Sequence, residues 1–480
     1  MNKRMLGYLF GVLLLIEAAL LLLPLLVAVI YREPILPFVI TVIALLAVGL
    51  PLIFLKPKTD RRLYAREGFV CAAGSWILLS LFGALPFVLS GAIPNYIDAI
   101  FETVSGLTTT GATILTEIEG LPYGILFWRS FTHWVGGMGV LMFMLAILPA
   151  DNRRAMHLLR AEVPGPQKGK IVPKLQKTAL ILYTIYLALT FIEIAALLLV
   201  GMEPYDAVVN ALGTAGTGGF AVKNASIAGY QNPAAEWIIA VFMLLFGINF
   251  NLYFFLLCGQ LRAVFKSEEL RTYLLIVGVA TAVITLNTLS LVGDLADTVR
   301  TAFFQVTSII STTGYATVNY DTWPMLSKMV ILLLTITGAC AGSTAGGLKL
   351  SRVLILLKNS LREIRHALRP RSVNVTRLDG CVLPEETVRT TTNYFSVYAL
   401  IFLLGALLIS VDGFSAEATL TASLTCLNNV GPGLGPIGPA GNFADFSAFS
   451  KIVLSLEMLI GRLEIYPLLI FLSPSTWKRM

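Results

Sequence analysis

Thr109-Thr110-Gly111-Ala112 is a glycine-centred polar run in an apolar chain, and three comparable runs follow it. They are Gly216-Thr217-Gly218-Gly219, Thr312-Thr313-Gly314-Tyr315 and Asn429-Val430-Gly431-Pro432. The central glycines, at 111, 218, 314 and 431, lie 107, 96 and 117 residues apart. Each interval has room for two membrane spans and a hairpin, so the four tetrads predict four repeats of one structural unit.

Composition places these repeats in a membrane. Of the 480 residues, 56% are hydrophobic and only 13% are charged, which is typical of a polytopic membrane protein. Apolar runs of about 20 residues, the length that crosses a bilayer, recur along the chain. Ten spans are predicted, at residues 5–31, 35–55, 69–92, 125–149, 178–201, 236–260, 272–292, 325–348, 390–411 and 451–472. An even number of crossings puts both termini on the same side.

The distribution of charge indicates which side that is. The net charge is +7, and basic residues gather in the loops 56–66 and 153–177, in the segment 349–389 and at both termini. Because Lys and Arg are enriched in cytoplasmic loops, we expect cytoplasmic termini and tetrads that face outward. The stretches 91–127 and 411–450 contain acidic residues but no Lys or Arg. They could form an acidic vestibule that attracts cations, or they could simply reflect the orientation rule.

A short helix-compatible stretch precedes each tetrad, at 97–107, 205–215, 299–310 and 415–427. Each is too short to cross a bilayer, yet each lies between two crossings. Non-helical backbone at membrane depth is tolerated only where protein or water surrounds it, so we expect four re-entrant hairpins around one axis. The partially negative C-terminal ends of the half-helices would then point inward and favour a cation at the centre.

The tetrads contain the residues that a carbonyl-lined filter needs. Backbone carbonyl oxygens can replace the water shell of a potassium ion, and glycine permits the strand conformation that this requires. Small or β-branched residues precede the glycines and can pack behind the strand: Thr110, Thr217, Thr313 and Val430. One such tetrad alone is typical of a loop turn, whereas four in register between paired spans favour an ion filter.

Four longer runs resemble the filter loops of the Trk/Ktr/HKT superfamily of potassium transporters. They are Ser105-Gly106-Leu107-Thr108-Thr109-Thr110-Gly111-Ala112, Gly213-Thr214-Ala215-Gly216-Thr217-Gly218-Gly219-Phe220, Ser311-Thr312-Thr313-Gly314-Tyr315 and Asn428-Asn429-Val430-Gly431-Pro432-Gly433. The resemblance covers residues 68–475, and the additional apolar pair at 1–67 resembles the Trk-type (TrkH) branch. It implies an all-α polytopic membrane protein with four pseudo-symmetric helix–pore loop–helix repeats around a central ion pore, plus two extra N-terminal transmembrane helices.

The resemblance also implies the domain organisation and the ion-binding residues. An N-terminal helix pair at 1–67 would be followed by repeats at 68–160, 161–266, 267–370 and 371–480. Potassium would bind at Thr109, Thr110, Gly111, Gly216, Thr217, Gly218, Thr312, Thr313, Gly314, Asn429, Val430 and Gly431. Glycine at position 111 implies a preference for potassium over sodium. Because the four tetrads differ from one another, we expect weaker discrimination than in a filter of four identical loops.

A run of glycines and hydroxyl residues at 338–347 interrupts the predicted span 325–348. Such residues weaken a helix, so the second helix of the third repeat should be broken. Related proteins have an intramembrane loop below the filter, which implies a gate formed by Gly342, Ser343, Thr344, Ala345, Gly346 and Gly347. Close helix packing through small residues is the alternative interpretation.

The last predicted span contains a charged residue, Arg462. A charge at the centre of a bilayer costs about 2.5 to 3.5 kcal/mol on insertion scales, so it normally faces protein or water. Family members have an arginine here that points into the pore, which implies that Arg462 sets an electrostatic barrier beneath the filter. The alternative is a structural ion pair of Arg462 with Glu457 or Glu464.

The segment 348–366 alternates apolar and basic residues and predicts an amphipathic cytoplasmic helix. It could lie on anionic membrane lipid or dock a soluble regulator. The resemblance implies a homodimer that works with a cytosolic, nucleotide-binding regulatory subunit (TrkA-like). The glycines of 431–435 follow no strand–helix unit and are weak support for a nucleotide site in this chain. We therefore expect K+ as the transported ion, no organic cofactor and no nucleic-acid partner.

Three functions are compatible with these features. The favoured one is channel-like potassium uptake across the bacterial cytoplasmic (inner) membrane, gated by the intramembrane loop and the regulatory subunit. The second is a symporter that couples potassium to protons or sodium; broken spans are compatible with it, but the spans offer few ionisable residues for a relay. A membrane enzyme is the third, and we do not expect one, because the polar residues cluster at repeated loops rather than in one catalytic constellation.

Overall fold

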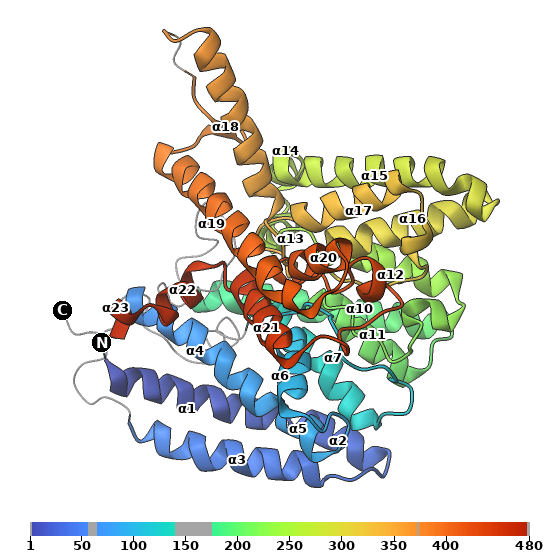
Figure 1. The fold of residues 1–480 in the computed structure, drawn as a ribbon, viewed down its shortest axis with the longest axis vertical. Coiled ribbons are helices and arrows are strands. Elements are labelled where there is room, and N and C mark those ends of the chain that lie inside the picture. Colours follow the sequence, from blue (N-terminus) through green and yellow to red (C-terminus); the bar gives the residue numbers. More distant parts are fainter. Residues whose placement is uncertain (1, 56–64, 140–174, 372–373, 478–480) are drawn as a thin grey trace.

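The computed structural model describes residues 2–55, 65–139, 175–371 and 374–477. Helices dominate the described chain (Figure 1), and its strands are one short antiparallel pair, β1 (Arg377–Leu378) and β2 (Cys381–Val382), in which Arg377 is opposite Val382. The basic residues at 56–62 and 153–174, which the sequence analysis assigned to loops, lie outside the described residues. The part of the predicted span 125–149 beyond residue 139 also lies outside them.

Two apolar spans precede the repeats. The first is α1 (Lys3–Leu20), continued by α2 (Leu22–Ile30), and the second is α3 (Leu36–Ile53). α1 and α3 pack together along the lower edge of Figure 1. Gly11 allows this packing, because a Cβ atom on it would lie 2.9 Å from the Gly49 carbonyl oxygen and 2.8 Å from Leu52 Cβ. Close approach through small residues is typical of helix pairs in membranes.

The turn between these spans holds the N-terminal pair to the first repeat. The Glu33 carboxylate accepts hydrogen bonds from the backbone N–H groups of Tyr123 (2.6 Å) and Gly124 (2.9 Å), at the start of α7 (Tyr123–Gly137). Backbone N–H groups at a helix start have no partner within the helix, and a carboxylate there also complements the helix dipole.

Each repeat begins with a long helix. These helices are α4 (Ala65–Gly83), followed by α5 (Leu85–Leu89), then α10 (Leu175–Leu199), α15 (Glu268–Val292) and α19 (Glu385–Ile409). The last three have 25 residues each. At 1.5 Å per residue, helices of this length cross a hydrocarbon core of about 30 Å.

A half-helix follows in each repeat, as predicted. The four are α6 (Tyr96–Leu107), α11 (Pro204–Gly216), α16 (Leu295–Ile310) and α20 (Ala416–Leu427). Three begin at side-chain caps, in which Asn95, Asp294 or Ser415 accepts a backbone N–H, and Pro204 is the first residue of the fourth. A side-chain cap and a proline at the first position are both common at helix starts, and they explain why these short segments are helical.

The second helix of every repeat is also short. These are α7, α12 (Pro233–Phe246), α17 (Met325–Thr337) and α21 (Ala448–Arg462), with 15, 14, 13 and 15 residues. The break predicted in the third repeat is found at residues 338–349, which we call the intramembrane loop; it leads into α18 (Leu350–Leu368).

Two further breaks correct the sequence analysis, which predicted unbroken spans at 236–260 and 451–472. α12 and α13 (Phe250–Leu257) meet at a bend of 91°, where the Asn249 side chain caps the start of α13. α21 and α22 (Tyr466–Leu472) are separated by residues 463–465, of which Glu464 and Ile465 have positive φ. Within the described residues, 6 helices are long and apolar enough to cross a membrane, or 7 if the bent pair counts as one span.

The half-helices and second helices alternate around a closed ring. α7 packs between α6 and α11, α12 between α11 and α16, α17 between α16 and α20, and α21 between α20 and α6. The order around the ring is the order in the sequence, and the last repeat closes on the first. This arrangement confirms the predicted fold class of four pseudo-symmetric helix–loop–helix repeats and an additional N-terminal pair.

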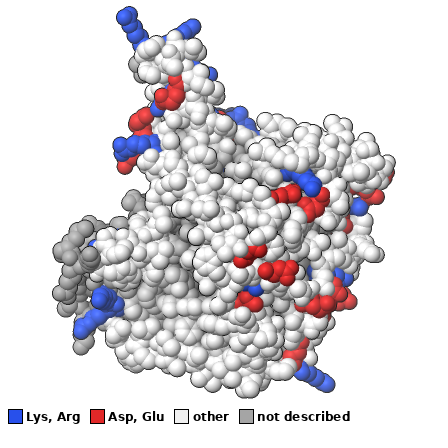
Figure 2. Space-filling view, in the orientation of Figure 1, with Lys and Arg blue, Asp and Glu red and all other residues white. Residues whose placement is uncertain are grey.

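The remaining elements are short. They are α14 (Leu261–Lys266), α23 (Pro474–Trp477) and the 3-10 turns η1 (Ser226–Tyr230), η2 (Tyr320–Thr322), η3 (Ser410–Asp412) and η4 (Gly435–Ile437). α18 projects from the body at the upper left of Figure 1, and Figure 2 shows Lys and Arg on its free end and near the start of α1. Asp and Glu lie mostly toward the centre and the right of that view. The charge asymmetry expected from the sequence is therefore visible on this face.

The contact between α1 and α3 leads to a stability prediction. Replacing Gly11 by Ala should lower the free energy of unfolding by about 1 to 3 kcal/mol, because the added methyl group overpacks against α3. The thermal midpoint of the purified protein in detergent measures this. Gly278→Ala on α15 is the matched control, because a Cβ atom there has no neighbour within 4 Å. Equal midpoints for the two variants would contradict the predicted overpacking.

Candidate functional site

The four half-helices end in the same backbone conformation. Thr109, Thr217, Thr312 and Asn429 have φ values of 58°, 55°, 58° and 55°. In each case the N–H of this residue bonds to the carbonyl three residues back, and the next N–H bonds to the carbonyl five residues back. This is a Schellman cap, which satisfies carbonyl groups at the end of a helix. Three of the four residues are threonines, for which a positive φ is uncommon and costs of order 1 to 3 kcal/mol.

The caps correct the register of the second repeat. Two residues after each cap residue comes a glycine of positive φ: Gly111 (78°), Gly219 (81°), Gly314 (85°) and Gly431 (95°). We call these the ring glycines. The sequence analysis took Gly218 as the counterpart of Gly111, whereas the backbone assigns that place to Gly219. Gly216, which the sequence analysis placed in the filter, is the last residue of α11. The equivalent segment is therefore Thr217-Gly218-Gly219.

The ring glycines lie around one centre. A Cβ atom on Gly111 would lie closer than 3.0 Å to the carbonyl oxygen of Gly218, and one on Gly219 would be as close to the Thr313 carbonyl oxygen. The series continues from Gly314 to the Val430 carbonyl oxygen and from Gly431 to that of Thr110. Each glycine thus faces the residue just before the next ring glycine, and the fourth contact closes the circle. Four hairpins converge on one axis, as the sequence predicts.

All four ring glycines line a single cavity of about 140 Å³. Its wall includes residues that follow the ring glycines, such as Ala112, Phe220 and Pro432, and the loop at 437–443. The half-helices point their C-terminal ends, where the helix dipole is partially negative, toward the ring. The cavity therefore opens onto the ring glycines, and the charged residues that line it are Arg129 and Lys223.

We call residues 109–111, 217–219, 312–314 and 429–431 the ring segments. Hydroxyl and amide side chains pack behind them. Thr108 Oγ1 lies 2.8 Å from Thr110 Oγ1, and Ser311 Oγ lies 2.7 Å from Thr313 Oγ1. Asn429 Nδ2 donates to Thr110 Oγ1 (3.0 Å) and so connects the fourth repeat to the first. These side chains are fully buried, and their hydrogen bonds stabilise the backbone of the ring segments, which carries the carbonyl groups.

The intramembrane loop lies directly against the ring segments. The Gly346 N–H donates to Thr312 Oγ1 at 2.6 Å, and a Cβ atom on Gly346 would lie 2.5 Å from the Asn428 carbonyl oxygen. Elsewhere the loop is bound to the break between α12 and α13, through Cys340 N–H to Gly247 O (3.1 Å) and Phe250 N–H to Gly342 O (3.0 Å).

One buried carboxylate connects the two ends of this loop. Glu269, in the first turn of α15, accepts from the Ala341 N–H (2.7 Å) and from the Ser351 N–H (3.1 Å). The loop is further closed on itself by a hydrogen bond from Leu350 N–H to Ala339 O (2.9 Å). The sequence analysis did not identify Glu269, which lies 72 residues before its first partner.

Arg462 reaches the same loop. Its guanidinium donates to the carbonyl oxygen of Thr344 (2.8 Å) and to those of Gly136 (2.5 Å) and Gly137 (2.7 Å) at the end of α7. The sequence analysis offered Glu457 and Glu464 as alternative partners of Arg462, but both bind other residues. Glu464 forms an ion pair with Arg352, and Glu457 accepts a hydrogen bond from Ser423 Oγ at 2.7 Å. Arg462 therefore bridges the intramembrane loop and the end of the first repeat's second helix.

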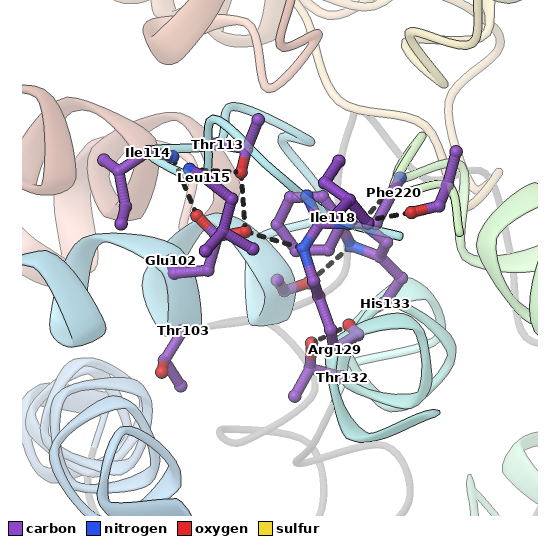
Figure 3. A network of polar contacts seen from close by, with 12 residues as sticks. Glu102, Thr103, Thr113, Ile114, Leu115, Ile118, Arg129, Thr132, His133 and Phe220 are labelled. Carbon is purple, nitrogen blue, oxygen red and sulfur yellow. Dashed lines mark hydrogen bonds and ion pairs between the residues drawn. The ribbon is translucent and has the colours of Figure 1, made fainter. Parts of the chain in front are cut away.

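A buried polar network beside the ring is missing from the sequence analysis (Figure 3). Glu102, Arg129 and His133 are all buried, and Arg129 Nε lies 2.6 Å from Glu102 Oε1. Arg129 and His133 are therefore core residues of the first repeat. Their spacing of four residues, which puts them on one face of α7, is the signal that could have indicated a shared role.

The acidic stretches at 91–127 and 411–450 are partly neutralised. Glu102 pairs with Arg129, and Asp98 pairs with Lys451 at 2.9 Å. Farther around the ring, Glu236 on α12 pairs with Arg300 on α16 at 2.8 Å. An acidic vestibule is thus weaker than counting carboxylates in the sequence indicates, and these pairs instead join neighbouring elements.

The fold and the ring define a class: a polytopic membrane protein in which four re-entrant half-helices surround one axis. The chain belongs to the TrkH family of cation transport proteins, whose family model matches residues 35–479. Because this is a family of transporters, the expectation that the chain is not an enzyme is confirmed.

Its relatives are similar over their whole length. The Trk system potassium uptake protein TrkH of Escherichia coli K12 is 38% identical over 491 residues, covering 100% of both chains. The protein of the same name from Vibrio parahaemolyticus is 36% identical over 487 residues, again covering 100% of both. The crystal structure of the potassium transporter TrkH from Vibrio parahaemolyticus has a TM-score of 0.89 at 34% identity and covers 100% of both chains.

The ring geometry predicts which glycines tolerate a side chain. Gly111→Ala should reduce cation uptake by about tenfold to a hundredfold, because the strain of a positive φ and the overlap with Gly218 O together amount to about 1 to 3 kcal/mol. Uptake of rubidium into cells that lack other uptake systems measures this, normalised to folded protein. Gly120→Ala, in the same outer loop but with no neighbour within 4 Å of its Cβ position, should transport normally. Full uptake by both variants would show that the ring does not need glycine.

Proposed function

We propose that this protein takes up potassium through the ring of backbone carbonyl groups formed by its four repeats. The observation that carries the proposal is the closed series of contacts among the ring glycines, in which each faces a carbonyl oxygen of the next repeat. Carbonyl rings of this kind replace the hydration shell of an ion. Relatives over the full length of the chain are named potassium uptake proteins, which supports potassium as the ion.

The proposed ion-binding set follows the corrected register. It consists of Thr109, Thr110 and Gly111 in the first repeat, Thr217, Gly218 and Gly219 in the second, Thr312, Thr313 and Gly314 in the third, and Asn429, Val430 and Gly431 in the fourth. Because the four segments differ in sequence, their carbonyls are held by different side chains. We propose a preference for potassium over sodium that is weaker than in a filter of four identical segments.

The gate in this proposal is the intramembrane loop together with Arg462. Residues 342–347 lie under the ring segments, and Gly346 N–H bonds to Thr312 Oγ1. Arg462 donates to Thr344 O, so the positive charge and the loop form one barrier on the ion path. Opening would require the loop to leave Thr312, which Glu269 and Arg462 oppose through their hydrogen bonds.

The setting in the cell is part of the same proposal. The chain would lie in the bacterial cytoplasmic (inner) membrane with both termini in the cytoplasm, and its repeats would divide at 67/68, 160/161, 266/267 and 370/371. It would work as a homodimer with a cytosolic, nucleotide-binding TrkA-like subunit, for which α18 is a contact. The relatives' names place them in a Trk system, which supports a partner of this kind.

Transport in vesicles tests the proposal against its alternative. The purified protein in vesicles should take up potassium and rubidium when voltage favours entry, with an unchanged initial rate when a proton or sodium gradient is imposed at constant voltage. A rate that follows the proton or sodium gradient would instead identify a symporter. Absence of potassium flux under every condition, with and without the regulatory subunit, would reject both.

The proposed barrier leads to a prediction for Arg462. Arg462→Ala should raise potassium flux several-fold, because it removes the charge and one hydrogen bond that holds the loop; a hydrogen bond to a charged group contributes about 1.5 to 3 kcal/mol. Initial rates in vesicles measure the effect at matched protein content. Arg462→Lys keeps the charge and is the control, with flux near that of the wild type. Loss of folded protein in Arg462→Ala, without higher flux, would support a purely structural role.

A further inference from the structure

The residue after the second ring glycine, Phe220, is bound by side chains from two other repeats. Its backbone N–H donates to His133 Nε2 at 3.2 Å. Its carbonyl oxygen accepts from the Tyr315 hydroxyl at 3.2 Å, and it shares this donor with the Asn210 carbonyl oxygen at 3.1 Å. His133 belongs to α7 in the first repeat, and Tyr315 directly follows the third ring glycine. Both polar backbone groups of Phe220 are thus held by side chains, one from each neighbouring repeat.

The contacts of His133 define its hydrogen-bonding roles. Nδ1 lies 2.7 Å from the Gly106 carbonyl oxygen, which can only accept, so Nδ1 carries the proton. Nε2 then has a free lone pair and accepts from Phe220 N–H. The imidazole ring also packs on the Phe220 ring, with centroids 4.2 Å apart. His133 therefore connects the last turn of α6 to the second ring segment, and a glycine at 218 leaves room for it, because a Cβ atom there would overlap the imidazole.

Arg129 also contacts Phe220 (Figure 3). Its guanidinium carbon lies 3.6 Å from the Phe220 ring centroid, and Nη1 donates to the Ala221 carbonyl oxygen at 3.0 Å. Glu102 fixes the guanidinium through Nε and also accepts from Thr113 Oγ1 (2.9 Å) and Ile114 N–H (3.0 Å). One carboxylate thus couples the segment after Gly111 to the segment after Gly219.

The residues that follow the other ring glycines are held differently. The Tyr315 carbonyl accepts from Ser308 Oγ of its own half-helix at 2.6 Å, and Pro432 has no N–H to be held. In the first repeat, the bonds from Thr113 and Ile114 go to Glu102 of the same repeat. In this comparison, the second repeat alone relies on side chains of both neighbouring repeats to position the residue after its ring glycine.

We propose that Phe220 is a hub through which His133, Arg129 and Tyr315 position the second ring segment, and that this hub determines how strongly the ring discriminates between potassium and sodium. The three side chains are positioning residues, because they act on the backbone next to Gly219 and not on the ion. This inference rests on the proposed function. It adds that selectivity depends on cross-repeat contacts at one of the four segments.

Two substitutions of His133 separate its two hydrogen bonds. Gln places an amide oxygen near the position of Nε2 and can still accept from Phe220 N–H, whereas Asn places an amide nitrogen near Nδ1 and keeps only the bond to Gly106 O. If the hub acts through Phe220, His133→Gln should retain most of the potassium-over-sodium preference. His133→Asn should lose about tenfold, the effect of about one buried hydrogen bond. Tyr315→Phe, which removes only a hydroxyl, should also lose selectivity.

The measurement is the ratio of potassium to sodium permeability from bi-ionic potentials or competing uptake in vesicles, at equal amounts of folded protein. The control is Asp98→Asn, which breaks a partly buried ion pair between α6 and Lys451 of α21 but touches no ring segment. It should lower thermal stability without changing the ratio.

Each outcome bears on the hub. A ratio that falls in His133→Asn and Tyr315→Phe but not in His133→Gln or Asp98→Asn supports it. A ratio unchanged in Tyr315→Phe and His133→Asn, or lowered equally in Asp98→Asn, overturns it. If His133→Asn does not fold, Tyr315→Phe against Asp98→Asn decides. A wild-type protein without potassium selectivity would instead contradict the proposed function and is recognised before any variant is compared.

Discussion

A polar backbone inside a bilayer must find partners, and the whole structure depends on how the four half-helix ends do so. Each ends in a Schellman cap, which bonds the free amides back to the helix and turns the chain sharply at Thr109, Thr217, Thr312 or Asn429. A positive φ is unfavourable for threonine, so it persists only where the surroundings enforce it. Here the enforcement comes from buried side chains behind each segment and from the neighbouring repeat. The turn lets the ring glycines approach the next repeat's carbonyl groups so closely that no side chain fits between them.

The layer beneath the ring follows from the short second helices. None of α7, α12, α17 and α21 exceeds 15 residues, so each ends before the roughly 20 residues that would cross a bilayer. Their free carbonyl groups need donors there, and Arg462 donates to two of them at the end of α7. The intramembrane loop occupies the place that a longer, continuous α17 would have filled. It forms hydrogen bonds with the break after α12. Breaks in neighbouring repeats therefore satisfy one another, which is how irregular backbone becomes tolerable at this depth.

The sequence is sufficient for much of this architecture. The half-helices are predictable because each is a helix-compatible stretch of about three turns that lies between two predicted spans and ends in a polar, glycine-centred tetrad. The register of the second repeat is not predictable in this way, since Gly216, Gly218 and Gly219 all lie next to or near Thr217. Only the cap geometry identifies Gly219 as the ring glycine. The breaks after Phe246 and Arg462 lack the dense glycine run of 338–347 and so look continuous. Arg129 and His133 are missed because their partners, Glu102 and Phe220, lie 27 and 87 residues away in the sequence.

The ring can close only after the fourth repeat has been synthesised. Asn429 and Thr110, which join the fourth repeat to the first, are 319 positions apart in sequence. During synthesis the first three repeats enter the membrane while one side of the circle is still missing, and the carbonyl groups facing that gap have only water or lipid beside them. A polypeptide that stops before the last repeat is therefore left with an open polar seam.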